Sequence, residues 1–305
     1  MAAIRAAVAV VRVESMPSAA RRMLLVHAHP DDETLWTGGV IARYATEGVD
    51  VALVTCTLGE QGEIILPELA GLGAGHADQL GGYRLGELRA ACTALGVSEQ
   101  RFLGGPGRWR DSGMVVEPGG RASLPADLHP RAFAGGALTE QVSELVEVLD
   151  ELRPQVVVTY GPDGGYGHPD HVRAHQVTMA AAEQVPAVAR VFWAVQPHSA
   201  VEAGIAALHG MAGLPFTPPE PDGLPAVADE EVTTVLDVGA QVQTAMRAIR
   251  AHGTQVTLWE GGGGDRAFAL SDGVARPVPE CEYFTLAGGT SPDGEGDLFA
   301  GLTLP

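Results

Sequence analysis

Short apolar runs alternate with amphipathic stretches along the first two thirds of the chain. Segments 23–28, 51–57 and 155–160 are nearly continuous apolar runs rich in Val and Leu, which is typical of strands covered on both faces. A 3.6-residue period is clearest over 138–152, where a helix is expected to end before Pro154. The repeated order of strand, loop and helix predicts an α/β fold of the Rossmann-like, doubly wound type with a mostly parallel sheet.

The remaining elements continue this alternation and then loosen. Up to residue 200 the pattern predicts three further helices. One runs from the loop after the first strand to Glu47, and the others cover 85–95 and 171–183. Strands are predicted at 101–103 and 191–196. The stretches 58–83 and 104–136 are rich in Gly or Pro and are expected to be irregular. Beyond residue 200, strands are expected at 232–238 and 281–286, a helix at 240–251, a Pro-rich link at 215–225 and a flexible tip at 261–264.

This pattern divides the chain into three regions. Residues 22–200 are expected to form a Rossmann-like domain, and residues 201–305 a smaller C-terminal α/β region that completes its pocket. Residues 1–21 fit no element and are expected to be a disordered or misannotated extension. Their apolar run, 6–11, is shorter than a secretory core of ~7–15 residues, and Met16 offers an alternative start.

Composition narrows the possible partners. The 305 residues are 46% apolar, which is ordinary for a globular protein, and they carry a net charge of −19. A field of that sign repels nucleic-acid phosphates and anionic lipid, so neither nucleic acid nor a membrane is expected as a partner. A small neutral or weakly polar substrate fits this charge better.

All 19 basic residues are arginines, which excludes several kinds of chemistry. Without lysine the chain has no Walker A phosphate site, no pyridoxal Schiff base and no kinase-type lysine. Its three cysteines form no C-x-x-C pair and suit a reducing cytoplasm, where we expect the protein to work. No apolar run reaches the ~18 residues typical of a membrane-spanning helix.

Two loops hold most of the candidate chemistry. His27-Ala-His-Pro-Asp-Asp-Glu33 follows the first predicted strand, and Gly164-Gly-Tyr-Gly-His-Pro-Asp-His171 follows the strand at 155–160. In open α/β sheets, ligands bind at loops that leave the carboxyl ends of the strands. The two clusters are therefore expected to meet at this edge, although they are far apart in sequence.

Each loop pairs two potential metal ligands at a spacing of three residues. His29 and Asp32 can converge on one point, and His168 and His171 have the same spacing. Two histidines and one carboxylate, with a position left open, suit catalytic Zn²⁺ and also Fe²⁺.

The neighbouring aspartates suggest supporting roles. Asp31 lies beside the ligand pair and could act as a general base, while Asp170 could orient the imidazole of His168. Taken alone, such aspartates are more often helix N-caps or solvated loop residues. Two matching clusters at the same sheet edge favour a metal site.

Other motifs are weak or absent. The patterns G-x-S-x-G, H-E-x-x-H and a G-x-G-x-x-G after a strand do not occur, which disfavours that kind of serine hydrolase, a zincin and nicotinamide binding. Cys56 lies in an apolar strand and is expected to be inert, and His27 is expected to be structural. Six further histidines lack matched partners and are expected to be surface or satisfied interior residues: His76, His129, His175, His198, His209 and His252.

Several of these segments resemble the LmbE/PIG-L family of zinc deacetylases. Ala28-His-Pro-Asp-Asp-Glu33 is similar to the family signature, and His168-Pro-Asp-His171 to its second motif. Four segments are similar to the deacetylases of mycothiol biosynthesis: 54–63, 76–84, 107–114 and 164–168. The resemblance covers about residues 22–300 and departs at 115–136 and 210–230.

The resemblance implies a reaction and a set of site residues. The reaction is metal-dependent hydrolysis of the acetamide of N-acetylglucosaminyl-inositol, with one Zn²⁺ per chain and Fe²⁺ as the other candidate. The implied metal ligands are His29, Asp32 and His171, and the implied general base is Asp31. Tyr166 and His168 would stabilise the oxyanion, with Asp170 orienting His168. The implied sugar–inositol contacts are Glu63, Arg84, Asp111 and Met114.

Two other functions compete with this one. A mycothiol S-conjugate amidase shares the metal motif, but Gly167 and the segment 107–114 favour the deacetylase. A non-catalytic sugar-binding or metal-storage module would keep the ligands and lose the acid–base residues. Asp31, Tyr166 and His168 are all present, which disfavours such a module.

Overall fold

A seven-stranded sheet forms the centre of the computed structural model, which describes residues 21–116, 122–291 and 296–303. The strand order is β3-β2-β1-β6-β7-β12-β8. The strands are β1 (Arg22–His27), β2 (Asp50–Thr55), β3 (Glu99–Phe102), β6 (Val156–Tyr160), β7 (Arg190–Val195), β8 (Thr234–Asp237) and β12 (Cys281–Gly289). The first five in the sheet order are parallel, and β12 runs antiparallel to both of its neighbours, β7 and β8. The predicted fold class, a mostly parallel α/β sheet, is confirmed.

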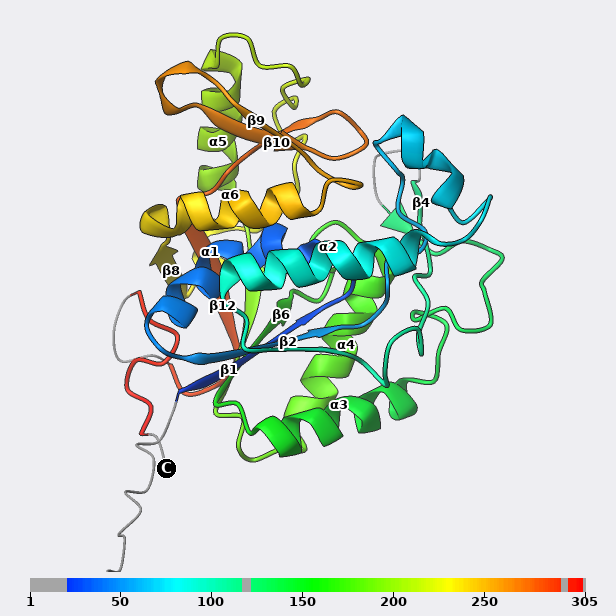
Figure 1. Ribbon diagram of the computed structural model, residues 1–305. Helices are drawn as coiled ribbons and strands as arrows, with labels where there is room; N and C mark the ends of the chain where they lie inside the picture. The colour runs from blue at the N-terminus through cyan, green and yellow to red at the C-terminus, as the bar shows by residue number, and fades with distance from the viewer. Residues whose placement is uncertain (1–20, 117–121, 292–295, 304–305) are drawn as a thin grey trace, which may run out of the picture.

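Helices cover both faces of this sheet. On β1 the side chains of Met23 and Leu25 pack on one face and those of Leu24 and Val26 on the other, and all four are buried. As Figure 1 shows, helices lie on both sides of the sheet. The first face is covered by α1 (Asp32–Thr46), α2 (Leu80–Leu95) and α6 (Val242–Ala251), and the second by α3 (Leu138–Leu152) and α4 (Pro169–Ala182).

The chain changes faces between β1 and β6. β1 pairs with β2 on one side and with β6 on the other. The loop after β1 leads into α1 on one face, while the loop after β6 leads into α4 on the opposite face. The two loops therefore meet at a topological switch point, which is where such sheets bind ligands.

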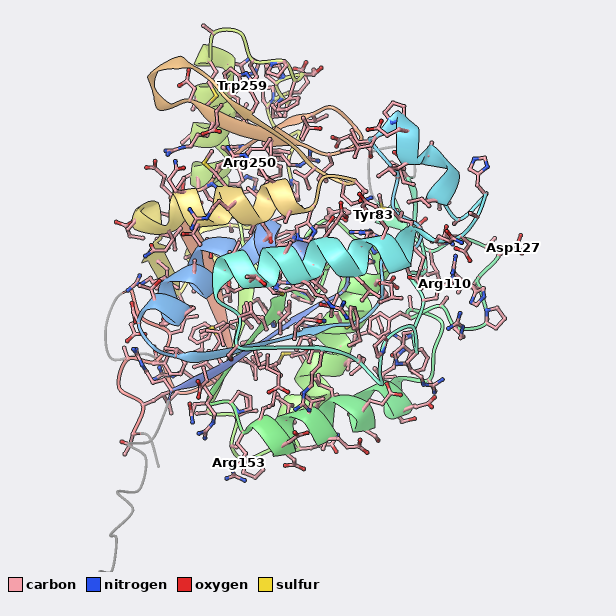
Figure 2. The ribbon with its side chains drawn as sticks, in the orientation of Figure 1. Tyr83, Arg110, Asp127, Arg153, Arg250 and Trp259 are labelled. Atoms are coloured by element: carbon pink, nitrogen blue, oxygen red, sulfur yellow. The ribbon has the colours of Figure 1, made fainter. Side chains whose placement is uncertain are left out.

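The C-terminal part adds strands to the main sheet and builds a second one. β8 and β12 extend the main sheet, whereas β9 (Thr257–Glu260), β10 (Arg266–Ala269) and β11 (Ala275–Pro277) form a separate antiparallel sheet. Figure 2 labels Arg250 on α6 and Trp259 on β9, and shows that the small sheet lies beyond α6 as seen from the main sheet. α5 (His198–Gly210) packs beside β11.

Several elements differ from the sequence expectation. α5 was not expected, because it buries few apolar side chains, Ile205 and Leu208, and so shows a weak period. β9, β10 and β11 are short and lie among glycines and prolines. α2 begins at Leu80 and not at residue 85. The pattern does not show this start because the first turn contains Gly81, a poor helix former. A side chain at that position would collide with Glu60 and Leu58.

Short elements complete the list. The stretch 104–136 contains the strand pair β4 (Val115–Val116) and β5 (Ala122–Ser123), and 3₁₀ helices occur at Pro67–Leu72, Asp229–Glu231, Gly239–Gln241 and Gly262–Gly264. The expected extension 1–21 lies outside the described residues except for Arg21. Among the described residues, the helices are too short or too polar to span a membrane.

Candidate metal centre

Three side chains, from the loop after β1 and from the first turns of α1 and α4, converge on one point. Nδ1 of His29 lies 3.2 Å from Oδ2 of Asp32 and 3.3 Å from Nε2 of His171, and that Nε2 lies 3.3 Å from Oδ1 of Asp32. Three ligands held ~2.0–2.1 Å from a tetrahedral Zn²⁺ lie about 3.3 Å from one another. The spacing of these atoms therefore fits a single metal ion.

The outward hydrogen bonds of both imidazoles support the same fit. Nδ1 of His171 lies 3.1 Å from the carbonyl oxygen of Gly164, and Nε2 of His29 lies 3.3 Å from Oδ2 of Asp170. These acceptors assign an N–H to each outward nitrogen, so the two inward nitrogens present lone pairs to each other. Two lone pairs beside the Asp32 carboxylate require a cation between them, either a proton or a metal ion.

A ring of carboxylates around His29 favours a positive charge at this place. The pKa of His29 is raised well above its ordinary value: burial opposes this, but Asp111, Asp170 and Asp32 outweigh it. Carboxylates that accept the outer N–H of a ligating histidine are common around metal sites.

Asp170 and Asp111, for which other roles were expected, both lie in this ring. The carboxylate of Asp170, expected to orient His168, instead faces His29 and accepts the backbone N–H groups of Ser112 and Ala134. Asp111, expected in the sugar–inositol pocket, is only 4% exposed, and its Oδ1 lies 3.6 Å from Nε2 of His29. Both carboxylates thus support a candidate ligand.

Tyr160, at the end of β6, was missed by the sequence reasoning. Its ring stacks on His171 with centroids 4.2 Å apart and planes 12° apart, and its hydroxyl accepts the backbone N–H of Ala28 at 2.8 Å. It therefore holds both loops. The available signal was a hydroxyl at the end of an otherwise apolar strand.

Asp31 occupies a strained turn beside the cluster. Its φ of 122° is unusual for a residue with a side chain, and such strain persists where the surroundings enforce it. Its carboxylate lies 3.0 Å from Nη2 of Arg84. Burial raises the pKa of Asp31 to about 6; Arg84 works against the rise and the neighbouring Asp32 adds to it.

Arg84, expected among the sugar–inositol contacts, lies beside Asp31. It is only 2% exposed, and besides Asp31 its guanidinium donates to the carbonyl oxygens of Gly59, at 2.8 Å, and Pro30. These partners direct Arg84 toward the loop that carries Asp31 and away from solvent.

His168 and Tyr166 lie on the open side of the cluster. Nδ1 of His168 accepts the backbone N–H of Asp170 at 3.1 Å, which leaves Nε2 as the protonated nitrogen of a neutral ring. Burial, with His29 and His171 nearby, lowers the pKa of His168 to about 2. The ring of Tyr166, whose residue is 37% exposed, lies 5.2 Å from that of His171.

The segment that follows Asp111 has exposed apolar side chains. Met114 is 44% exposed, and Val115, Val116 and Leu124 are also exposed beside it. Glu63 is exposed on the loop between β2 and α2. Met114 and Glu63, unlike Arg84 and Asp111, are therefore open to an approaching molecule.

A buried ion pair lies behind Asp31. Nε2 of His252 lies 2.7 Å from Oε1 of Glu33, and both residues are 0% exposed. Burial opposes charge on both, yet the pairing raises the pKa of His252 and lowers that of Glu33. His252 was expected to be an ordinary interior or surface histidine, and its sequence position gives no sign of this partner.

Comparison with known proteins places this chain within one family. Residues 24–182 match the family described as GlcNAc-PI de-N-acetylase (PIG-L). The 1D-myo-inositol 2-acetamido-2-deoxy-alpha-D-glucopyranoside deacetylase 1 of Saccharopolyspora erythraea is 61% identical over 285 residues, covering 92% of this chain and 94% of that protein. The deacetylase of the same substrate name from Actinosynnema mirum is 56% identical, covering 92% and 97%.

Solved structures share the fold at low sequence identity. The N,N'-diacetylchitobiose deacetylase of Pyrococcus horikoshii is 18% identical with a TM-score of 0.50, covering 77% of this chain and 70% of its own. The 4-carboxy-2-hydroxymuconate hydratase of Pseudomonas putida is 17% identical with a TM-score of 0.53, covering 90% and 99%. Since one is a deacetylase and the other a hydratase, the fold alone does not assign the reaction.

Proposed function

This chain belongs to the GlcNAc-PI de-N-acetylase (PIG-L) family, and on that premise we propose that it is a metal-dependent N-deacetylase. Its substrate is 1D-myo-inositol 2-acetamido-2-deoxy-α-D-glucopyranoside, which it hydrolyses to the free amine and acetate in mycothiol biosynthesis. The observation that carries the proposal is the convergence of His29, Asp32 and His171 on one point beside Asp31, in a chain 61% identical to a deacetylase of that substrate.

His29, Asp32 and His171 would hold the metal. Two imidazoles and one carboxylate suit Zn²⁺, which we propose as the native ion, and Fe²⁺ is the alternative that the same ligands accept. When bound, the ion supplies Lewis-acid polarisation of the acetamide carbonyl.

Asp31 accepts a proton from the attacking water. A base works best when its pKa lies near the working pH, and a value of about 6 places Asp31 closer to neutrality than an ordinary aspartate. Arg84 favours the ionised carboxylate and fixes its direction. The proton that Asp31 acquires is then available to the departing amine.

His168 donates a hydrogen bond to the oxyanion. Its neutral ring carries the proton on Nε2, because Nδ1 is occupied by the N–H of Asp170. Such a donor is worth roughly 10²–10³ in rate. Tyr166, at the open side of the site, is the second candidate donor.

Glu63 and Met114 are the proposed contacts to the sugar–inositol. Both are exposed, whereas Arg84 and Asp111 are buried and bonded to Asp31 and to backbone groups within the protein. We therefore assign Arg84 and Asp111 to the support of Asp31 and His29, and only indirectly to substrate choice.

An acetate-release assay on the acetylated glucosaminyl-inositol tests this function. We expect acetate release that a chelator abolishes and Zn²⁺ restores, with Fe²⁺ compared under anaerobic conditions. Cleavage of a mycothiol S-conjugate at its cysteinyl amide, measured in parallel, should be slower. Faster cleavage of the conjugate would assign the amidase function instead, and no turnover of either substrate would reject both.

A further inference from the structure

The segment that follows α6 lies behind the loop of Asp31. His252, just after the end of this helix, reaches Glu33 in the first turn of α1, with 2.7 Å between Nε2 and Oε1. The two residues are far apart in sequence, and both are fully buried. A buried carboxylate without a partner is costly, so this pairing fixes the Glu33 side chain.

Glu33 passes this constraint on to Asp31. Its second oxygen, Oε2, accepts the backbone N–H of Asp31 at 2.9 Å, while Oε1 also accepts the hydroxyl of Thr34 at 2.5 Å. The Asp31 backbone, with its φ of 122°, is thus held by the carboxylate that His252 fixes. Arg84 holds the Asp31 side chain from the other end.

The same segment has a second, separate anchor. Thr254 donates to Glu87 of α2 through its backbone N–H, at 2.8 Å, and its hydroxyl, at 2.7 Å. The carbonyl oxygen of Thr254 accepts the N–H of Ile65 at 2.9 Å. The segment is therefore fastened to α2 and to the β2–α2 loop by bonds that do not involve Asp31.

We propose that His252 is a positioning residue that, through Glu33, sets the orientation of the general base Asp31. This inference rests on the proposed function, because it takes Asp31 as the base. Among the described residues, the His252 side chain hydrogen-bonds to Glu33 and not to a metal ligand, Glu63 or Met114. Its loss should therefore lower kcat and leave KM and the metal content nearly unchanged.

Two polar substitutions with side chains of different length test the hydrogen bond between residue 252 and Glu33. His252→Gln places an amide nitrogen about where Nε2 lies and can still donate to Glu33, whereas the shorter side chain of His252→Asn cannot reach. We expect His252→Asn to lower kcat for acetate release about 10–100-fold and His252→Gln to recover most of it. Glu87→Gln, which weakens the other anchor of the segment, is the matched control and should keep kcat.

Hydrogen exchange at the Asp31 amide gives a readout that does not depend on turnover. We expect faster exchange in His252→Asn than in the wild type, and a near-normal rate in His252→Gln. Equal kcat in His252→Asn and the wild type, equal losses in the Asn and Gln variants, or an equal loss in Glu87→Gln would each overturn the proposal. If the wild type releases no acetate, the proposed function fails, and an unchanged exchange rate in His252→Asn would separately reject the positioning role.

Discussion

The backbone and the side chain of Asp31 are held by different residues. Glu33 accepts its N–H, and Arg84 pairs with its carboxylate. The residue next to it, Asp32, starts α1 and turns its carboxylate to His29 and His171. The carboxylates of these two adjacent aspartates therefore have different partners. The backbone turns between them at Asp31, whose φ is 122°.

Asp31→Asn should leave the metal bound and remove most of kcat. The amide keeps the size of the side chain but accepts no proton, and a general base contributes ~10²–10⁴-fold in rate. Metal content by elemental analysis and acetate release on the same preparation check this. Loss of metal from the variant would mean that Asp31 is itself a ligand.

Arg84→Met should move the acid limb of the pH profile of kcat to higher pH. The limb rises as Asp31 loses its proton, and removal of the Arg84 charge raises the pKa of Asp31 above about 6. An arginine beside an aspartate lowers the pKa of that aspartate by about 1–3 units. Arg84→Lys keeps the charge and is the control, so a limb that shifts equally in both variants would contradict the electrostatic account.

His168→Ala should lower kcat about 10²–10³-fold at every pH without changing the shape of the profile. With its pKa lowered to about 2, His168 stays neutral over the working range and does not titrate in the basic limb. The pH profiles of kcat for this variant and for Tyr166→Phe measure how much each of the two donors contributes to the rate. A basic limb that disappears in His168→Ala would show that His168 is cationic during turnover.

The candidate ligands could be proposed from the sequence, whereas their supports could not. Spacing in the short motifs at strand ends offers His29, Asp32, His168 and His171, and the resemblance to the family selects His29, Asp32 and His171 among them. Arg84 and His252 acquire their roles from bonds across the fold, and an isolated arginine or histidine carries no sign of its partner. Arg84 was consequently expected among the sugar–inositol contacts, and its place beside Asp31, where its two terminal nitrogens contact Gly59, Pro30 and Asp31, could not be foreseen.

Among the elements, those with a continuous pattern were predictable. α3 has the predicted bounds, Leu138–Leu152, because its apolar stripe packs on the sheet and it ends just before Pro154. α1 hides a break that periodicity does not show: Thr37 has φ −143°, and Glu282 of β12 accepts the N–H groups of Gly39 and Val40. That second start of a helix depends on a residue at the far end of the chain.

Gly164→Ala should disturb the connection between β6 and α4. Gly164 has φ +67°, and a Cβ there would lie 2.7 Å from Cβ of His171 and 2.9 Å from the backbone nitrogen of Val172. We expect the free energy of unfolding to fall by about 1–3 kcal/mol from backbone strain, with weaker metal binding because His171 shifts. Denaturant unfolding and metal titration measure the two effects.

Gly161→Ala in the same loop is the control. Its φ is not positive, and the nearest atom to an added Cβ, Oδ1 of Asp163, is at an ordinary 3.6 Å. We expect this variant to keep its stability and its metal affinity. Equal destabilisation by both substitutions would show that the loop resists any side chain, irrespective of His171.

On the scale of the whole molecule, the metal would join the two halves of the sheet. Its candidate ligands come from the loop after β1 and from the first turns of α1 and α4, and these two helices lie on opposite faces. Removal of the metal should therefore lower the stability of the entire protein and not that of one loop. At free metal 1,000-fold above Kd, binding contributes about 4 kcal/mol.

Thermal unfolding with and without a chelator measures the stabilisation that the metal provides. The direction in which this stabilisation changes with pH can be predicted. Because the pKa of His29 is raised, the metal-free protein keeps a proton on this ring, and the metal must displace it. Metal affinity and the stabilisation it provides should fall as the pH drops. A stabilisation that grows on acidification would contradict the assignment of His29 as a ligand.

The position of His252 beyond the segment matched by the family has a consequence for the order of synthesis. His29, Asp32 and His171 all lie within residues 24–182, whereas the partner of Glu33 follows α6. Chains leave the ribosome from the N-terminus, so the metal ligands emerge well before His252 does. The metal ligands therefore emerge before the residue that fixes Glu33, and we expect full hydrolytic capacity only once the segment after α6 is in place.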